Sequence, residues 1–173
     1  MIDLPLFSYG MIMADPPWCF DTWSAAGKKQ KSPEGHYSTM STDEIAALPV
    51  GHLAGRDCVL WLWATHPMLD QQLGVMRAWG FRFVTSGVWV KRTRNGKLAF
   101  GTGYRLRCAS EPFLLGVNGD PETCRSVRTV IDGPVREHSR KPDEAYSAAE
   151  TLVPNVRRAD LFARQRRLGW DGW

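Results

Sequence analysis

The sequence predicts an α/β fold in which helices cover a largely parallel sheet. Short apolar runs of strand length alternate along the chain with stretches of helical periodicity, which is the pattern of βαβ units. The first apolar run ends in Asp15-Pro16-Pro17, and open α/β sheets bind their ligands beyond the carboxyl ends of strands. No linker, repeat or low-complexity tract divides the chain, so we expect a single domain over residues 1–173.

The amino-terminal elements are two strands separated by a loop and a short helix. Residues 9–14 and 59–63 are continuous apolar runs that predict buried strands. Residues 19–40 are rich in Gly, Lys and Ser and predict a long loop. The segment Ser41-Thr42-Asp43-Glu44 has Glu three residues after Ser, a capping box that predicts a helix through Ala47.

The central elements are a helix, a strand and a basic loop. Pro67 favours the first turn of a helix, apolar residues recur at helical spacing as far as Trp79, and Gly80 ends the pattern. Residues 82–90 predict a third strand, and residues 91–97 form a basic loop without periodicity.

The carboxyl-terminal elements are strands on either side of one helix. Residues 112–117 and 126–131 are further strand candidates. Residues 141–144 place two carboxylates in the first turn of a helix, where the macrodipole favours them, and the apolar face of this helix extends to Leu152. Residues 158–163 predict the last strand.

The charge balance permits an anionic partner such as nucleic acid. The chain carries 22 Lys and Arg against 18 Asp and Glu, which gives a net charge of +4 and a pI near 9.0. The alternative to an anionic partner is that these basic residues only form a solvated surface. Eight Trp residues are many for this length, and Trp both anchors cores and stacks well on bases.

The cysteines and the apolar runs exclude several classes of protein. The four cysteines lie far apart without Cys-x-x-Cys or paired His, so we expect no metal site. A disulfide framework is not expected in a chain of core-forming size without a signal peptide. No apolar run approaches the roughly 20 residues that span a bilayer, so we expect no membrane partner and a reducing, cytoplasmic location.

The tetrapeptide Asp15-Pro16-Pro17-Trp18 carries the chemistry. Proline lacks a backbone N–H and fixes φ, so the two prolines leave rigid carbonyls that point at a ligand. A carboxylate and one such carbonyl match the two protons of an aromatic amine. Acceptors on these protons pull the nitrogen toward tetrahedral geometry and disperse the charge that develops as a methyl group arrives. Trp18 is expected to stack on the base; the alternative is an ordinary turn that ends a strand.

This tetrapeptide resembles the Asp/Asn/Ser-Pro-Pro-Tyr/Phe/Trp motif of amino-methyltransferases. Its Asp-Pro-Pro-Trp form resembles the MT-A70 family, which contains the catalytic subunit of the eukaryotic mRNA adenosine methyltransferase and bacterial and phage relatives. Further motifs follow in the order of that family: 36–44, 62–65, 79–81, 89–91, 139–144, 161–164 and 169–173. Several motifs in one order are more specific than any one alone. The family commonly continues with Gly-Asn-Glu or Gly-Asn-Gln, which contacts the cofactor ribose, whereas this sequence stops at Trp173.

The resemblance implies a Rossmann-like SAM-dependent methyltransferase fold that is circularly permuted, with the catalytic motif before the cofactor-binding motif. It implies catalytic roles for four consecutive residues, namely Asp15, Pro16, Pro17 and Trp18. It implies S-adenosyl-L-methionine as the cofactor, held by residues of the catalytic motif, of the last helix start and of the last strand: Asp15, Pro17, Lys141, Asp160, Leu161, Phe162, Arg164, Arg166 and Arg167. No glycine-rich dinucleotide fingerprint is present, so the cofactor rests on the resemblance. For the three arginines a solvated basic edge is the alternative.

On the substrate side the resemblance implies contacts with the target adenine from Tyr37, Trp63, Glu111 and Ser139. Glu111 could instead be an acid at the core edge that pairs with Arg. Trp61 and Trp89 are expected in the core because their strands are apolar. Cations in two loops could either neutralise phosphates or remain solvated: Lys28, Lys29, Lys31, Arg92, Arg94 and Lys97. A base has to leave the stack to be methylated, so a flipped or single-stranded adenine is implied.

The sequence therefore predicts an enzyme that methylates the 6-amino group of adenine in nucleic acid. We expect DNA rather than RNA, because the compact chain resembles the bacterial and phage members. The alternatives are an RNA adenine methyltransferase, a noncatalytic nucleic-acid-binding partner subunit, and a cytosine amino-methyltransferase. Partner subunits lose the Asp-Pro-Pro-Trp motif, and Ser is commoner than Asp at its first position in the cytosine group. No target-recognition domain is visible, so specificity is expected from loops or from a second subunit. A homo-oligomer or a second subunit is the expected protein partner.

Overall fold

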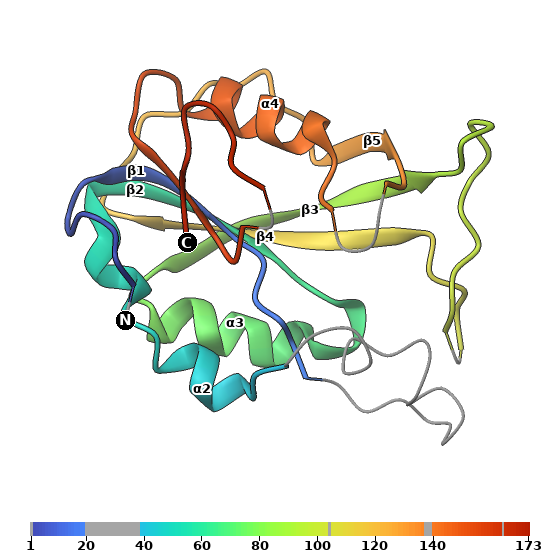
Figure 1. Ribbon diagram of the computed structural model, residues 1–173, viewed down its shortest axis with the longest axis horizontal. Helices are drawn as coiled ribbons and strands as arrows, with labels where there is room; N and C mark the ends of the chain where they lie inside the picture. Colours follow the sequence, from blue (N-terminus) through green and yellow to red (C-terminus); the bar gives the residue numbers. More distant parts are fainter. Residues whose placement is uncertain (1, 20–38, 104, 137–139, 164) are drawn as a thin grey trace.

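A computed structural model describes residues 2–19, 39–103, 105–136, 140–163 and 165–173 of the chain. Seven strands form one sheet in the order β5-β3-β4-β2-β1-β6-β7 (Figure 1). The strands are β1 (Tyr9–Ala14), β2 (Ala54–Trp63), β3 (Arg82–Arg92), β4 (Ser110–Asn118), β5 (Val130–Pro134), β6 (Arg158–Leu161) and β7 (Asp171–Gly172). Strand β4 is antiparallel to both of its neighbours, whereas every other pairing is parallel. The predicted α/β class is confirmed, with a mixed sheet in which one strand is reversed.

Helices cover both faces of this sheet. Helices α2 (Thr42–Ala46) and α3 (Leu69–Ala78) lie on one face and α4 (Asp143–Leu152) on the other (Figure 1). The predicted capping box is present, because the Ser41 hydroxyl accepts from the Glu44 amide at 3.2 Å and the Glu44 carboxylate accepts from the Ser41 amide at 2.8 Å. Two short 3₁₀ turns, Val50–Leu53 and His66–Met68, precede β2 and α3. Pro67 therefore lies in the 3₁₀ turn that leads into α3.

The bounds of β3 and β4 extend by one or two residues beyond prediction, and those of β2, β5 and β6 also differ. Strand β2 begins earlier than expected, at Ala54. The strand expected at 126–131 forms instead as β5, which includes Pro134 because an edge strand has no ladder partner for the missing proline N–H on one side. The last strand ends at Leu161 because Phe162 has φ of 65°, which lies outside the β region. The 19–40 loop lies outside the described residues except at its ends.

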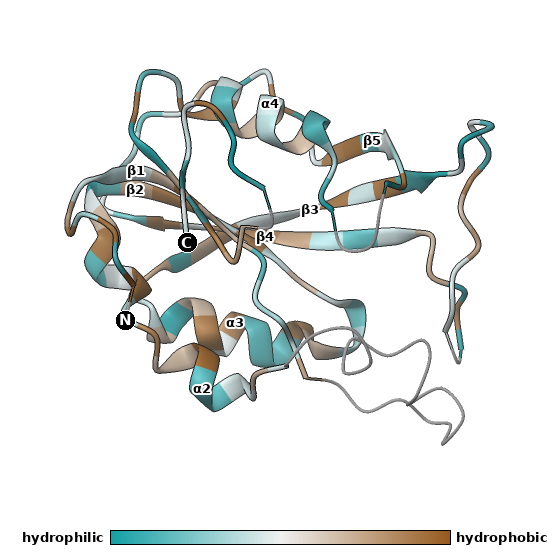
Figure 2. Cartoon of the chain, viewed as in Figure 1, coloured by the Kyte–Doolittle hydropathy of each residue, from teal (hydrophilic) through white to brown (hydrophobic). Residues whose placement is uncertain are grey.

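The core has one apolar layer on each side of the sheet. Alternate residues of β1 serve the two layers: Ile12 and Ala14 face α2 and α3, whereas Met11 and Met13 face α4. Figure 2 shows hydrophobic residues concentrated in the central strands. Trp61 and Trp89 are buried as predicted. Among the described residues, no helix is long and apolar enough to cross a membrane.

Candidate active site

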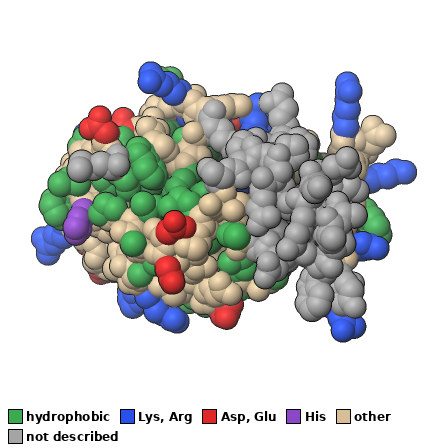
Figure 3. Space-filling view, turned by 60° about the horizontal axis from the view of Figure 1, so that its bottom comes forward, with side chains coloured by type: hydrophobic (Ala, Val, Ile, Leu, Met, Phe, Trp, Pro, Cys, Tyr) green, Lys and Arg blue, Asp and Glu red, His purple; other side chains and the backbone are tan. Residues whose placement is uncertain are grey.

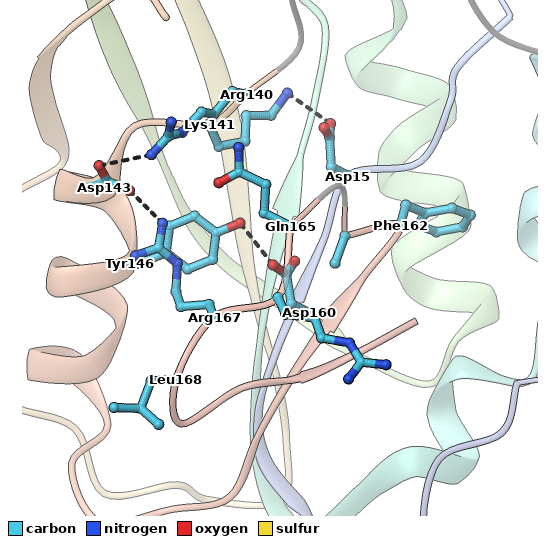
Figure 4. Close-up of a pocket in the computed structure, with 12 residues that line it drawn as sticks. Asp15, Arg140, Lys141, Asp143, Tyr146, Asp160, Phe162, Gln165, Arg167 and Leu168 are labelled. Carbon is cyan, nitrogen blue, oxygen red and sulfur yellow. Dashed lines mark hydrogen bonds and ion pairs between the residues drawn. The ribbon is translucent and has the colours of Figure 1, made fainter. Parts of the chain in front are cut away.

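The Asp15 motif lies at the carboxyl edge of the sheet, where β1 and β6 end side by side. These strands are parallel neighbours, and the Asp15 amide donates to the Leu161 carbonyl at 3.2 Å just beyond the ladder. This hydrogen bond holds the first motif of the chain against the last main strand. Helix α4 begins beside them, so residues from three distant segments meet at this edge (Figure 4).

The two prolines hold the motif rigid, and Trp18 anchors it in the core. The Trp18 amide donates to the Pro16 carbonyl at 2.8 Å, and the Pro17 carbonyl accepts from the Met40 amide at 2.9 Å. The Trp18 indole N–H donates to the Trp63 carbonyl at 3.1 Å, and the side chain is only 5% exposed. The expected stacking of Trp18 on a base is therefore corrected: the ring fills the core and fixes the motif to β2.

Four charged side chains alternate in sign behind the motif. The Lys141 ammonium lies 2.9 Å from Asp15 Oδ1 and 2.6 Å from Glu111 Oε1. The Lys91 ammonium lies 2.7 Å from the other carboxylate oxygen of Glu111. Lys141 also sits over the Trp63 ring, 5.2 Å from its centroid. We call Lys91, Glu111, Lys141 and Asp15 the ion-pair chain; it runs from the end of β3 to the end of β1.

The ion-pair chain keeps Glu111 and Lys141 ionised despite their burial. Burial alone would raise the pKa of Glu111, but the ammonium groups of Lys141 and Lys91 hold this pKa well below its usual range. Burial would likewise lower the pKa of Lys141, and the carboxylates of Asp15 and Glu111 raise it instead. The Asp15 carboxylate is thus paired with a cation that stays charged across the physiological range.

A cavity of about 360 Å³ opens beside Asp15 (Figure 4). It lies between the ends of β1 and β6, the start of α4 and the chain after β6. Its lining carries both signs of charge together with apolar surface: Asp15, Arg140, Lys141, Asp143, Tyr146, Asp160, Phe162, Ala163, Gln165, Arg166, Arg167 and Leu168. This size is typical of sites for small organic ligands, and the mixed lining suits a zwitterion with an apolar part.

Asp160 gives the cavity a buried carboxylate of unusual pKa. The Tyr146 hydroxyl donates to Asp160 at 2.9 Å. Burial raises the pKa of Asp160 to about 6, aided by the charge of Asp15, although the Tyr146 hydrogen bond opposes this shift. Burial and the charge of Asp160 raise the pKa of the Tyr146 hydroxyl, so it remains a donor.

Most of the predicted cofactor residues meet at this cavity. Its walls include six of them: Asp15, Lys141, Asp160, Phe162, Arg166 and Arg167. Leu161 is fully buried in the core, and Pro17 is not part of the lining. Arg167 is not a solvated edge charge, because its guanidinium pairs with Asp143 and lies 3.8 Å from the Tyr146 ring centroid, whereas Arg166 is exposed.

The predicted substrate residues divide into two groups. Glu111 and Trp63 both contact Lys141, so the structure places them behind the cavity wall rather than in it. Glu111 is thus an acid with two cationic partners, as one alternative expected, although these are lysines instead of Arg. Tyr37, Ser139 and the cofactor candidate Arg164 lie outside the described residues.

Sequence reasoning missed Tyr146, Asp143 and Arg140 among the lining residues. Tyr146 follows Asp143 by three residues on α4, and this spacing places both on one helix face. This spacing could have identified both residues from the sequence, given that the apolar face of α4 packs against the sheet. Asp143 pairs with three guanidinium groups, those of Arg136, Arg140 and Arg167. The described part of the chain holds no group of three or more His, Cys, Asp or Glu side chains arranged for a metal ion.

The sheet, the acidic motif at the end of β1 and the two-signed cavity beside it define a Rossmann-like fold of the methyltransferase class. The chain belongs to the MT-A70 family, whose model matches residues 9–173. It is 35% identical over 170 residues to an Arabidopsis thaliana protein named N(6)-adenosine-methyltransferase MT-A70-like, a match that covers 95% of this chain and 23% of that protein.

Two further relatives differ in how much of their length is matched. The type II methyltransferase M.MunI of Mycoplasma sp is 27% identical over 189 residues, which cover 98% of this chain and 78% of that protein. The human N(6)-adenosine-methyltransferase catalytic subunit METTL3 is 31% identical over 163 residues, which cover 92% of this chain and 26% of that protein. The chain thus spans about a quarter of the length of the adenosine methyltransferases that it matches.

Proposed function

We propose that this protein transfers a methyl group from S-adenosyl-L-methionine to the 6-amino group of adenine in DNA. The observation that carries the proposal is the placement of Asp15: its carboxylate is fixed at a strand end, in the wall of a ligand cavity, by Lys141 at 2.9 Å. The names of the relatives, N(6)-adenosine methyltransferases and a type II methyltransferase, support the same chemistry.

Asp15 acts on the amine of the base. Its carboxylate accepts a hydrogen bond from one amino proton, and a carbonyl of Pro16 or Pro17 accepts from the other. Each of these carbonyls already accepts from one backbone amide, and a carbonyl oxygen has two lone pairs, so one remains. Both acceptors are fixed before the base arrives, so they stabilise the positive charge on nitrogen in the transition state without reorganisation.

The cavity residues fit the cofactor. S-adenosyl-L-methionine supplies a methyl group on a positively charged sulfur, together with an amino-acid zwitterion and an adenosine. Arg166, Arg167 and Lys141 provide cations for a carboxylate, and Phe162 provides an aromatic face. Asp160 is 4% exposed and has acceptor capacity beyond the hydrogen bond from Tyr146, which suits an ammonium or hydroxyl donor.

The preference for DNA is supported by the type II methyltransferase M.MunI among the relatives, whose match covers 98% of this chain. The partly buried position of Asp15, at 19% side-chain exposure, supports a substrate adenine that is flipped out of a duplex or single-stranded.

The test is transfer of labelled methyl from S-adenosyl-L-methionine to matched DNA and RNA oligomers, followed by nucleoside analysis. We expect label in N6-methyladenine of DNA, and its loss in Asp15→Ala and Asp15→Asn. If label appeared only in RNA, the substrate would be RNA instead of DNA. If label appeared in cytosine, the protein would be a cytosine amino-methyltransferase. Normal turnover by both Asp15 variants would remove the catalytic role of this residue.

A further inference from the structure

A clasp of three side chains joins β7 to the start of β1. The Asp171 carboxylate accepts from the Tyr9 hydroxyl at 2.8 Å and from the Arg157 guanidinium at 2.7 Å, both at Oδ2. The Arg157 guanidinium also lies 5.2 Å from the centroid of the Tyr9 ring. We call Tyr9, Arg157 and Asp171 the clasp; none of these three residues lines the cavity beside Asp15.

The clasp fixes a strand that has little ladder of its own. Strand β7 is an edge strand of two residues, and it joins β6 through two residue pairs. Arg157 and Tyr9 hold the pKa of Asp171 below its usual range, whereas burial and Asp171 raise the pKa of Tyr9 to about 12. The carboxylate therefore stays an acceptor and the hydroxyl stays a donor across the physiological range.

Strand β7 leads directly to Trp173, which brackets Phe162. The Trp173 amide donates to the Asp160 carbonyl at 3.0 Å, and the Trp173 carbonyl accepts from the Ala163 amide at 3.0 Å. These two hydrogen bonds lie on either side of Phe162 in the sequence. The Phe162 and Trp173 rings also pack edge to face, with centroids 5.1 Å apart. We call these three contacts of Trp173 the bracket.

The bracket holds Phe162 in a conformation that phenylalanine rarely adopts. Its φ of 65° lies in the left-handed region, which is strained for a residue with a Cβ. Such a conformation persists only where the surrounding structure over-determines it, and it is common at ligand sites. Phe162 lines the cavity, and Figure 4 shows its ring on the side of Asp15, away from Tyr146. The strained residue is therefore part of the ligand site.

We propose that Asp171 and Trp173 are positioning residues, which hold Phe162 in the left-handed conformation so that its ring is in place before the adenine of S-adenosyl-L-methionine arrives. This inference rests on the proposed function and specifies how its cofactor site is kept in shape. A ring that is fixed in advance loses less conformational entropy when the ligand binds. The clasp lies outside the cavity, and β7 and the bracket connect it to Phe162.

Two variants weaken the clasp with little change of shape. Tyr9→Phe removes the hydroxyl and keeps the buried ring, whereas Asp171→Asn removes the charge of the carboxylate. The matched control is Asp132→Asn. It removes the same charge from a carboxylate that also pairs with an arginine, Arg92 at 2.8 Å, but lies in β5 at the other edge of the sheet.

Phe7 provides a control for the backbone conformation. It has φ of 52°, and its amide donates to the His52 carbonyl at 2.8 Å, so a contact other than the bracket holds it. Its side chain is 68% exposed, and Figure 3 shows hydrophobic side chains gathered at the end of the molecule where Figure 1 places the chain before β1. Phe7 lies two residues from Tyr9, so a general loosening around the clasp would reach it.

The first measurement is urea unfolding of the protein without ligand. Glycine is less strained than alanine at a positive φ, so Phe162→Gly should unfold at a higher urea concentration than Phe162→Ala. This difference should shrink in the Asp171→Asn and Tyr9→Phe backgrounds, because residue 162 can then relax. The corresponding difference between Phe7→Gly and Phe7→Ala should stay the same in these backgrounds, and Asp132→Asn should change neither difference.

The second measurement is the affinity for S-adenosylhomocysteine by calorimetry. Phe162→Ala should weaken binding by roughly 5- to 150-fold, as expected for the loss of a ring that stacks on a base. Asp171→Asn and Tyr9→Phe should weaken it by part of this factor, and they should have no further effect in the Phe162→Ala background, since coupled residues are not additive. Asp132→Asn should bind as the unaltered protein does.

The inference is overturned if the difference between glycine and alanine at position 162 does not depend on the clasp. It is also overturned if the clasp variants bind S-adenosylhomocysteine as tightly as the unaltered protein, or if they weaken binding equally with and without the Phe162 ring. Failure of the unaltered protein to bind would remove both the inference and the cofactor. Coupled binding without methyl transfer to any nucleic acid would contradict only the proposed function, whereas methyl transfer with binding that ignores the clasp would contradict only the inference.

Discussion

The Lys141 ammonium lies 2.9 Å from Oδ1 of Asp15, and it is the cation that separates this carboxylate from that of Glu111. The two acidic residues come from the end of β1 and from β4, whereas Lys141 precedes α4. One buried cation therefore holds three parts of the sheet edge together. Removing it leaves two partly buried carboxylates in mutual repulsion.

Lys141→Met should destabilise the protein by up to about 3–5 kcal/mol, because it breaks the buried ion pair with Asp15 and removes one of the two cations that pair with Glu111. Urea denaturation measures this change. Glu111→Gln in the Lys141→Met background should recover part of it, since it removes the repulsion between the Glu111 and Asp15 carboxylates, although Lys91 then loses its carboxylate partner. Equal stability of Lys141→Met and the unaltered protein would show that Lys141 is not needed to compensate these carboxylates.

Asp160→Asn should change how stability depends on pH. The pKa of Asp160 is raised from 3.8 to about 6, so between these values the folded state binds more protons than the unfolded state. Stability conferred by this group therefore falls as pH rises from about 4 to about 6, by up to roughly 3 kcal/mol. The variant should lack this fall, so its stability relative to the unaltered protein should be greater at pH 7 than at pH 4. Parallel pH curves for both proteins would contradict the raised pKa.

Tyr146→Phe should raise the pKa of Asp160 further. The hydroxyl donates to Asp160 at 2.9 Å and lowers its pKa, whereas the ring packs against Trp170 at 5.3 Å between centroids and remains in the variant. Titration of the Asp160 carboxyl by NMR should show the shift directly. We also expect weaker binding of S-adenosylhomocysteine by calorimetry, because Tyr146 lines the cavity. If the pKa of Asp160 were the same in Tyr146→Phe and the unaltered protein, the Tyr146 hydroxyl would not be the group that lowers this pKa.

Trp18→Ala should cost about 3–5 kcal/mol of stability, as expected for a large side chain removed from a core. Trp18→Phe retains much of the volume but removes the 3.1 Å hydrogen bond to the Trp63 carbonyl, so its cost should be smaller. Thermal unfolding distinguishes the two. If Trp18→Ala were as stable as the unaltered protein but bound substrate poorly, the ring would be a base-stacking surface after all.

Parts of the fold and site that depend on local pattern could be predicted from the sequence. The apolar run of β1 and the Ser41–Glu44 capping box are local signals, and both elements form as expected. The end of β6 could not be predicted, because it depends on the positive φ of Phe162, a residue type that gives no such signal. The reversal of β4 depends on how distant strands pair.

In the site, too, the features that depend on local sequence could be predicted, whereas those that depend on distant contacts could not. The position of Asp15 at the sheet edge could be predicted because its turn follows a strand, and the positions of Lys141 and Asp160 beside it through the family resemblance. The role of Trp18 was wrong because a sequence does not reveal which way a ring points, and Trp63 accepts its N–H only in the folded chain. The link from Glu111 to Lys91 joins residues of neighbouring strands, so it could be seen only in the structure.

The adjacency of β1 and β6 has a consequence for biosynthesis. Met11, Ile12 and Met13 leave the ribosome before the other strands of the sheet, yet their pairing partners from Arg158 onward are among the last residues of the sheet to appear. Until then one edge of β1 has unpaired backbone groups beside apolar side chains, which favours aggregation. The cavity beside Asp15 is completed only after β6 has been synthesised, so a nascent chain has no complete cavity while the sheet is still being extended.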